Sequence, residues 1–423
     1  MPESEAPNSI LANQPTPQWI CPEYVQKVLR NYFLDEDLQI VEIFITPATA
    51  KGENYASTMT RVRVKYTNPG QRNLQSGSFL IKSNVENDEY TSGKLSDCDV
   101  FSREMEIYSK IIPKLRKILQ SKDLDEELVP RIIDIDYAHD SIMFEDLTAR
   151  SFVPADRVKG FDMAHAKMVL RKLAKWHAAS AVLGHAEPEI FQSYDRGLMT
   201  RRTDVHVPYY ENSLRFCASA VSRLPGYEKY ASKMFKLQNK LVELGRRAFD
   251  RRNDRLNVFV HGDLWITNVL FKYNANMHPV DATLIDFQFS FWGSPTIDLH
   301  YFFNTSLSDE LVLDGQEELV QYYYEMLVED LQGLGYKGKI PTLKEFWIEF
   351  MDTGIYGFIS GCLVKPYMIN EDASADADLA SLLQEDERAE NFKRVVFSNE
   401  RVHQNLKKLL PIFDRRGFLD VHQ

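Results

Sequence analysis

The stretch that decides the fold runs from Val258 to Leu299 and reads VFVHGDLWITNVLF and then, after a short gap, ATLIDFQFSFWGSPTIDL. Each apolar run ends in polar residues, so Asp263, Asn268 and Asp286 are predicted at the mouths of two β-strands rather than within them. A carboxylate, a neutral oxygen ligand and a second carboxylate can then converge on one point. Oxygen ligands of this kind suit Mg²⁺, which proteins hold with one or two carboxylates and substrate phosphates.

The spacing of these residues matches an arrangement found in protein kinases. There a catalytic-loop Asp accepts the hydroxyl proton, and an Asn five residues later holds metal ions together with the Asp of a D-F-G motif. In this sequence the pattern H-G-D-x-x-x-x-N is followed by D-F-Q. The two motifs together predict an active site, and the alternative is a pair of capping aspartates with a turn Asn.

Composition narrows the class of protein. The sequence comprises 423 residues, 44% of them hydrophobic, which is enough for one large or two ordinary globular domains. A net charge of -11 argues against general binding of nucleic acid. The four cysteines lie far apart, which favours buried, reduced thiols in a cytoplasmic protein. No signal peptide and no membrane span are predicted, and no protein partner is indicated.

The first third of the sequence reads as a small β-rich region. A helix is expected over residues 22–31 and strands over 38–46 and 57–66, joined by the turn sequence ATAKGENY. The turn lacks G-x-G-x-x-G, yet backbone N–H groups of a tight turn can still cradle phosphate. The candidates for that role are Gly52, Glu53, Asn54 and Ser57. An ordinary hairpin turn is the alternative.

Lys82 ends an apolar strand, and a helical pattern follows about twenty residues later. Lysines at such positions commonly face solvent, but in kinases a strand Lys grips the nucleotide phosphates and is oriented by a Glu on the next helix. Glu104 fits that partner and Glu106 fits it less well.

A hinge is predicted after two further strands at residues 131–136 and 140–144. Backbone groups from Glu145 to Leu147 could hydrogen-bond an adenine edge there, which divides the protein into an N-terminal lobe, 1–145, and a C-terminal lobe, 146–423. His177 is interpreted as a packed histidine, and residues 371–390 as an acidic, solvated stretch. Helices are expected from Asp162 onward and over residues 213–224, 227–249, 316–331, 343–363 and 385–410.

Taken together, Lys82, Glu104, the EDL at 145–147, VHGDLWITN at 260–268, IDFQ at 285–288 and GSPTIDLHYFF at 293–303 resemble the ecdysteroid kinase-like family. That family belongs to the choline-kinase and aminoglycoside-phosphotransferase branch of the protein-kinase-like fold. The resemblance implies an α+β, bilobal fold with a small β-rich N-lobe and a larger, mostly helical C-lobe. The motif HGDxWxxN with DFQ, and the absence of APE, separate this branch from protein kinases.

The resemblance also implies roles for single residues. Asp263 would be the catalytic base, Asn268 and Asp286 the Mg²⁺ ligands, and Lys82 with Glu104 the pair that grips the ATP phosphates. His261 and Asp298 would support the catalytic loop.

The implied reaction is transfer of the ATP γ-phosphoryl group to a hydroxyl of a small lipophilic molecule, an ecdysteroid or a related steroid or xenobiotic. Trp292 and Tyr301 are candidates for the wall of the acceptor site, with core packing as the alternative. The alternatives are an inactive nucleotide-binding scaffold or a choline or amino-alcohol kinase. A protein kinase comes after these, and a metal-dependent hydrolase comes last.

Overall fold

The computed structural model describes residues 16–48, 57–68, 71–84, 100–124, 126–370, 382–384 and 386–420. The protein divides into two compact units, one made of residues 1–109 and 130–152 and the other of residues 110–129 and 153–423. Gly52, Glu53 and Asn54, most of the acidic stretch and Cys98 lie outside the described residues.

The first unit is built on a five-stranded antiparallel sheet with the order β1-β2-β3-β5-β4. Its strands are β1 (Gln39–Pro47), β2 (Ser57–Asn68), β3 (Gln71–Asn84), β4 (Ile132–Asp136) and β5 (Ser141–Glu145). Along β2, buried Val62 and Val64 alternate with the more accessible Arg61 and Arg63, as expected for a strand with one covered face.

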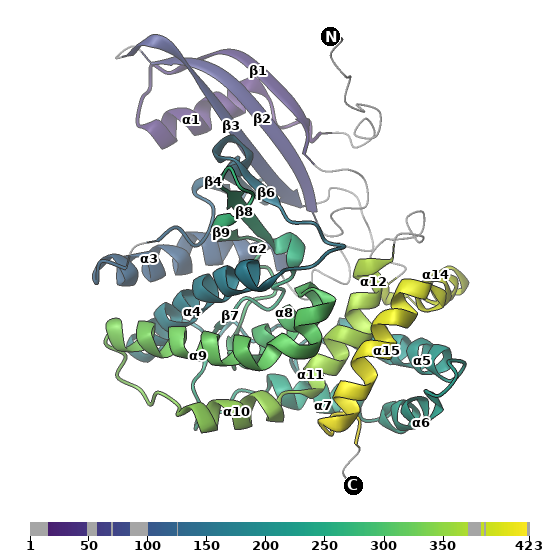
Figure 1. Ribbon diagram of the computed structural model, residues 1–423. Coiled ribbons are helices and arrows are strands. Elements are labelled where there is room, and N and C mark those ends of the chain that lie inside the picture. The colour runs from purple at the N-terminus through teal and green to yellow at the C-terminus, as the bar shows by residue number, and fades with distance from the viewer. Residues whose placement is uncertain are drawn as a thin grey trace. The chain divides into compact units, whose positions relative to one another are not determined.

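Helix α1 (Pro22–Phe33) lies along this sheet (Figure 1). Its buried side chains Val25, Val28 and Leu29 recur at helical spacing and share one hydrophobic cluster with residues of β2 and β3. One face of the sheet is thereby covered. Further along the sequence lie α2 (Val100–Glu106), a π-helical turn (Ile107–Ile111) and α3 (Ile112–Gln120), of which α3 belongs to the second unit.

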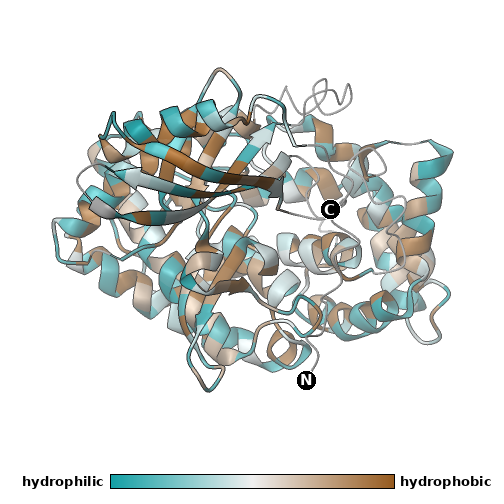
Figure 2. Cartoon of the chain, turned by 90° about the horizontal axis from the view of Figure 1, so that it is seen from above, coloured by the Kyte–Doolittle hydropathy of each residue, from teal (hydrophilic) through white to brown (hydrophobic). Residues whose placement is uncertain are grey.

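The second unit is mostly helical, and its helices carry apolar and polar stretches in alternation (Figure 2). The long helix α4 (Met163–Ala186) begins at Asp162, whose side chain accepts from the backbone N–H of His165. The other helices are α5 (Val207–Val221), α6 (Glu228–Leu237), α7 (Leu241–Phe249), α8 (Thr296–Ser306), α9 (Gln316–Gly333), α10 (Leu343–Asp352), α11 (Ile355–Phe358), α12 (Lys365–Ile369), α14 (Glu387–Ser398) and α15 (Glu400–Arg415). Within the described residues, no helix is long and apolar enough to cross a membrane.

Short strands of the second unit carry the motif segment. Strand β7 (Val258–Val260) pairs with β10 (Phe291–Gly293), and β8 (Val269–Tyr273) pairs with β9 (Pro279–Leu284). Along the sequence, the division between the two units falls within a short strand, β6 (Phe152–Pro154). The β8–β9 register places Val269 opposite Leu284, so the residues just before β8 lie next to those just after β9.

The predicted α+β fold, with a β-rich first part and a mostly helical remainder, is confirmed. The structure corrects the extent of three helices. Residues 227–249 form two helices, residues 343–363 are interrupted after Asp352, and the helix predicted over 385–410 is divided at Asn399. The last division has a local cause, because the Asn399 side chain accepts from the backbone N–H groups of Arg401 and Val402 and so begins a new helix.

Candidate active site

The loop that carries Asp263 begins with a glycine that no other residue can replace without movement. Gly262 has a φ of +83°, and a Cβ built on it would lie 2.2 Å from the carbonyl oxygen of Phe289. A side chain at this position would therefore clash with backbone in a conformation that already favours glycine. The G of the HGD motif is a requirement of the turn that presents Asp263.

The same loop is held by Asp298 at the start of α8. Its carboxylate accepts from the backbone N–H of His261 at 2.7 Å and of Gly262 at 2.9 Å. His177 Nε2 lies 3.0 Å from the same carboxylate, and Tyr323 Oη lies 2.5 Å from His177 Nδ1. All of these side chains are buried. This hydrogen-bond network fixes the backbone of the loop. Of its members, only Asp298 could be predicted from the sequence for this role.

His261 joins the two motif segments. Its Nε2–H donates to the carbonyl oxygen of Ile285 at 3.0 Å, and its ring packs against Phe287 at a centroid distance of 4.6 Å. Burial lowers the pKa of His261, which favours a neutral ring that donates from one nitrogen only. His261 thus lies within the second unit as a link between the HGD and DFQ segments.

Three of the residues predicted to take part in the reaction, Asp263, Asn268 and Asp286, come from segments that lie together in the second unit. The side-chain amide of Asn268 donates to the backbone oxygen of Asp263 at 2.8 Å and approaches its Oδ2 at 3.3 Å. The backbone N–H of Ile285 donates to the carbonyl of Asn268 at 3.0 Å, which places Asp286 one residue from this contact. Asp286 has a φ of +68°, a conformation that is costly for a residue other than glycine and is typical of functional sites.

Asn268 and Asp286 fit a Mg²⁺ ion by their chemistry. The amide nitrogen of Asn268 is engaged by Asp263, so its amide oxygen is the atom that a cation would contact. The described residues contain no group of three or more His, Cys, Asp or Glu side chains with metal-binding geometry. A two-ligand site of carboxylate and amide oxygen is the kind that Mg²⁺ shares with nucleotide phosphates.

Lys82 and Glu104 meet in the first unit. Lys82 Nζ lies 2.6 Å from Glu104 Oε2, and the two residues are only 7% and 1% exposed. Lys82 is therefore buried in β3 and does not face solvent, in contrast to the alternative interpretation. A cation and an anion buried together at this distance form a strong, charge-assisted hydrogen bond.

The segment from Glu145 to Leu147 is fixed by Asp146. Asp146 Oδ2 accepts from Arg61 Nε at 2.9 Å and from Ser78 Oγ at 2.7 Å, and its Oδ1 accepts from the backbone and side chain of Thr148. Burial opposes the ionised form, but these hydrogen bonds and the charge of Arg61 lower the pKa of Asp146. No sequence pattern indicates Arg61 or Ser78 for this role, because both lie far from Asp146 along the polypeptide.

The remaining predicted residues lie in different surroundings. Ser57 is buried at the start of β2. Trp292 stacks on Phe191 with a centroid distance of 4.5 Å and an interplanar angle of 7°, so packing accounts for its position. Tyr301 lies on α8 and contacts Asp263 directly, with Oη 2.7 Å from Asp263 Oδ1.

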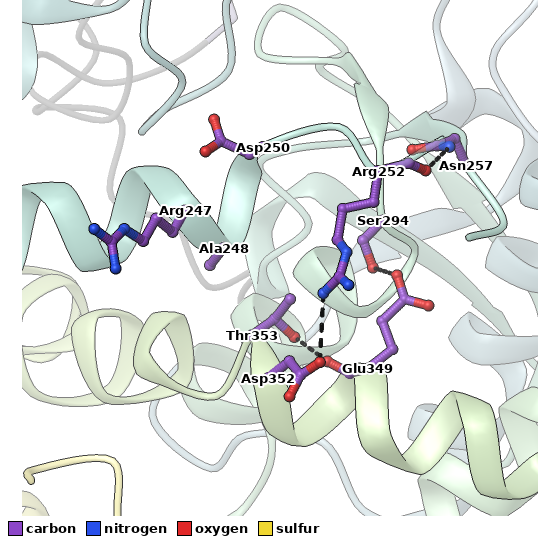
Figure 3. A pocket seen from close by; sticks show the side chains of 9 residues that line it. All are labelled: Arg247, Ala248, Asp250, Arg252, Asn257, Ser294, Glu349, Asp352 and Thr353. Carbon is purple, nitrogen blue, oxygen red and sulfur yellow. Dashed lines mark hydrogen bonds and ion pairs between the residues drawn. The ribbon is translucent and has the colours of Figure 1, made fainter. Parts of the chain in front are cut away.

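A pocket of about 320 Å³ lies elsewhere in the second unit (Figure 3). Its charged side chains pair with one another or with polar neighbours: Arg252 lies 3.5 Å from Asp352, and Ser294 Oγ lies 2.5 Å from Glu349. Burial raises the pKa of Glu349. None of the predicted catalytic, metal or nucleotide residues lines this pocket.

Comparison with known proteins identifies a family. A solved structure of an ethanolamine kinase from Plasmodium vivax is similar over 96% of this protein and 93% of that one, with 12% identity and a TM-score of 0.43. A search of curated proteins found no match. The model of the ecdysteroid kinase-like family matches residues 51–336, which is well over half of the sequence and includes Lys82, Asp263 and Asp298. The protein therefore belongs to the ecdysteroid kinase-like family.

Proposed function

We propose that the protein is an ATP-dependent small-molecule kinase that phosphorylates a hydroxyl of a lipophilic acceptor, an ecdysteroid or a related steroid or xenobiotic, in the cytoplasm. The observation that carries the proposal is the arrangement around Asp263. The side chain of Asn268 donates to the backbone oxygen of Asp263, and the carbonyl of Asn268 accepts from the backbone N–H of Ile285, the residue before Asp286. Membership of a kinase-like family supports the same function.

Each residue has a role that its surroundings support. Asp263 accepts the proton of the acceptor hydroxyl as the oxygen attacks the γ-phosphorus and the bond to ADP breaks. Lys82, oriented by Glu104, offsets negative charge on the α and β phosphates. Asn268 and Asp286 would hold Mg²⁺, which when bound neutralises charge on the phosphates. The protein itself contributes position and charge rather than covalent chemistry.

The lipophilic acceptor is supported by the surroundings of Asp263. Tyr210, Tyr301 and Tyr356 are buried in the second unit, and the charge of Asp263 contributes to a raised pKa at all three after the larger effect of burial. These phenols stay protonated and neutral, so they add no charge beside Asp263 that would favour a charged acceptor. Aromatic rings also bind quaternary ammonium groups, so a choline or amino-alcohol kinase remains the second candidate.

A substrate screen tests the proposal. Purified protein with Mg²⁺ and ATP would be incubated with a panel of ecdysteroids, sterols and other lipophilic alcohols, with choline and ethanolamine in parallel, and products sought by mass spectrometry. We expect a mass increase of one phosphate on a steroid alcohol, and none with Asp263→Asn. Phosphorylation of choline or ethanolamine alone would show that the acceptor is an amino alcohol and not a steroid. No product across the panel while ATP still binds would favour an inactive scaffold.

A further inference from the structure

Helix α8 holds the catalytic loop at two points of one face. Asp298 accepts from the backbone N–H groups of His261 and Gly262, and Tyr301, three residues later, reaches the side chain of Asp263 with its hydroxyl at 2.7 Å. Residues three apart lie on the same face of a helix, so one rigid element fixes both the backbone and the carboxylate of the base.

Tyr301 is itself held in place. It is 3% exposed, and its ring lies nearly parallel to that of Tyr356 at a centroid distance of 6.0 Å and an angle of 12°. Tyr356 is fully buried and packs edge-on against Phe249. Burial raises the pKa of Tyr301 well above its usual value, so the phenol keeps its proton and acts as the donor to Asp263.

The two oxygens of Asp263 have different neighbours. Oδ1 accepts from Tyr301, whereas Oδ2 lies 3.3 Å from the amide nitrogen of Asn268, on the side of the predicted metal ligands. A carboxylate with one oxygen fixed by a buried donor loses its freedom to rotate. The oxygen on the Asn268 side, Oδ2, would then be the one that faces the acceptor hydroxyl.

We propose that Tyr301 is a positioning residue that fixes the Asp263 carboxylate so that Oδ2 accepts the acceptor's proton. This inference rests on the proposed function, and it replaces the expectation that Tyr301 lines the acceptor site. In the step concerned, the acceptor O–H bond breaks as its oxygen bonds to the γ-phosphorus, the bond from phosphorus to the ADP oxygen breaks, and the proton passes to Oδ2 and then to water.

Steady-state kinetics of Tyr301→Phe, with the steroid alcohol that the wild type phosphorylates fastest in the screen, provide the first test. We expect kcat to fall by about tenfold or more, since a hydrogen bond to a charged group is lost, with KM for ATP and acceptor within about twofold of wild type. Tyr227→Phe is the matched control, because its hydroxyl donates to the carbonyl of Lys407. We expect p-aminophenylalanine at position 301, which restores a donor on the ring, to recover most of kcat.

A raised KM for the acceptor with unchanged kcat would make Tyr301 a substrate contact and overturn the inference, as would wild-type kinetics. Should phenylalanine at 301 prevent folding, 4-fluorophenylalanine, which fills more of the space of the lost hydroxyl, takes its place.

Crystal structures of the wild type and Tyr301→Phe test the inference without any acceptor. We expect the Asp263 carboxylate to keep one orientation in the wild type and to rotate or become disordered in the variant. An unchanged carboxylate would overturn the inference. If the wild type phosphorylates nothing in the screen, the proposed function fails, whereas this comparison still decides the role of Tyr301.

Discussion

Gly262 shows how one residue places Asp263, the proposed catalytic base. Gly262 and Gly226 both have a φ near +83°, but a Cβ at Gly226 would meet nothing within 4 Å, whereas one at Gly262 would meet the Phe289 carbonyl. Gly226→Ala should therefore cost only the strain of the left-handed backbone, about 1–2 kcal/mol. Gly262→Ala should cost clearly more and abolish phosphate transfer, as urea denaturation and the kinase assay would measure. Equal losses of stability would contradict the predicted clash.

A substitution at Glu104 tests how much the buried ion pair in the first unit contributes to stability. Glu104→Gln removes the negative charge that lies 2.6 Å from the buried Lys82 ammonium, so the free energy of unfolding should fall by about 3–5 kcal/mol. The matched control is Glu318→Gln, which breaks an ion pair of the same 2.6 Å length between more exposed side chains. There the loss should be about 0–1 kcal/mol. Chemical denaturation measures both, and similar values for the two variants would contradict the prediction.

His300 makes stability depend on pH. Burial lowers its pKa to about 3, while an unfolded histidine titrates near 6.5. As pH falls from 6.5 toward 3, the unfolded state gains a proton that the folded state cannot accept, so the free energy of unfolding falls in that window. In the wild type, His300 Nε2 donates to the carbonyl of Phe350 at 2.8 Å. In His300→Gln the side-chain amide can replace this donor, and an amide does not titrate.

The unfolding free energy of His300→Gln should therefore fall less than that of the wild type between pH 7 and pH 5. Urea denaturation at pH 7, 6 and 5 provides the measurement. The exposed His278, changed to Gln in the same way, serves as control. Identical pH slopes for wild type and His300→Gln would rule out this contribution.

At the scale of elements, Asp298 links α8 to the HGD loop through two hydrogen bonds to the backbone of the loop. Asp298→Asn keeps the shape of the side chain but replaces one of two acceptor oxygens by a donor that faces a backbone N–H. Leaving such a buried donor without an acceptor should lower the free energy of unfolding by about 1–3 kcal/mol and reduce kcat strongly. Denaturation and the kinase assay measure the two effects, and unchanged kcat would show that the loop is held by other contacts.

Sequence patterns located elements better than their ends. The alternation in β2 and the helical spacing in α1 reflect one covered face, so both could be predicted from periodicity. The break at Asn399 could not, because apolar residues recur at helical spacing on both sides of it, and only the cap geometry ends one helix and starts the next.

For the whole molecule, binding of Mg²⁺ and ATP should raise stability, because a ligand that binds only the folded state shifts the unfolding equilibrium. At 100 times its dissociation constant the gain is about 2.7 kcal/mol. Asp286→Asn should remove the part of this gain that depends on Mg²⁺, while the exposed Asp254→Asn should keep it. Thermal unfolding with ATP, in the presence and absence of Mg²⁺, measures the difference. An equal Mg²⁺-dependent gain in both variants would exclude Asp286 as a ligand.

The candidate site could be predicted from sequence where its residues lie close together along the polypeptide or follow a known spacing. Asp263, Asn268 and Asp286 belong to one short stretch, and local strand pairing brings them together. The supports come from distant segments. His177 lies 121 residues from Asp298 in the sequence, and a helical histidine among apolar neighbours looks like any core residue. Long-range hydrogen bonds of this kind leave no pattern in a single sequence.

The i, i+3 spacing of Asp298 and Tyr301 on α8 has a use in sorting related genes. A relative that keeps HGDxxxxN and DFQ but has lost the tyrosine three residues after this aspartate would retain every conventional mark of an active enzyme. With this geometry it would turn over slowly, since its base would be free to rotate. If Tyr301 positions the base as proposed, the short signature D-x-x-Y after the DFQ motif is expected to divide relatives into fast and slow enzymes before any of them is purified.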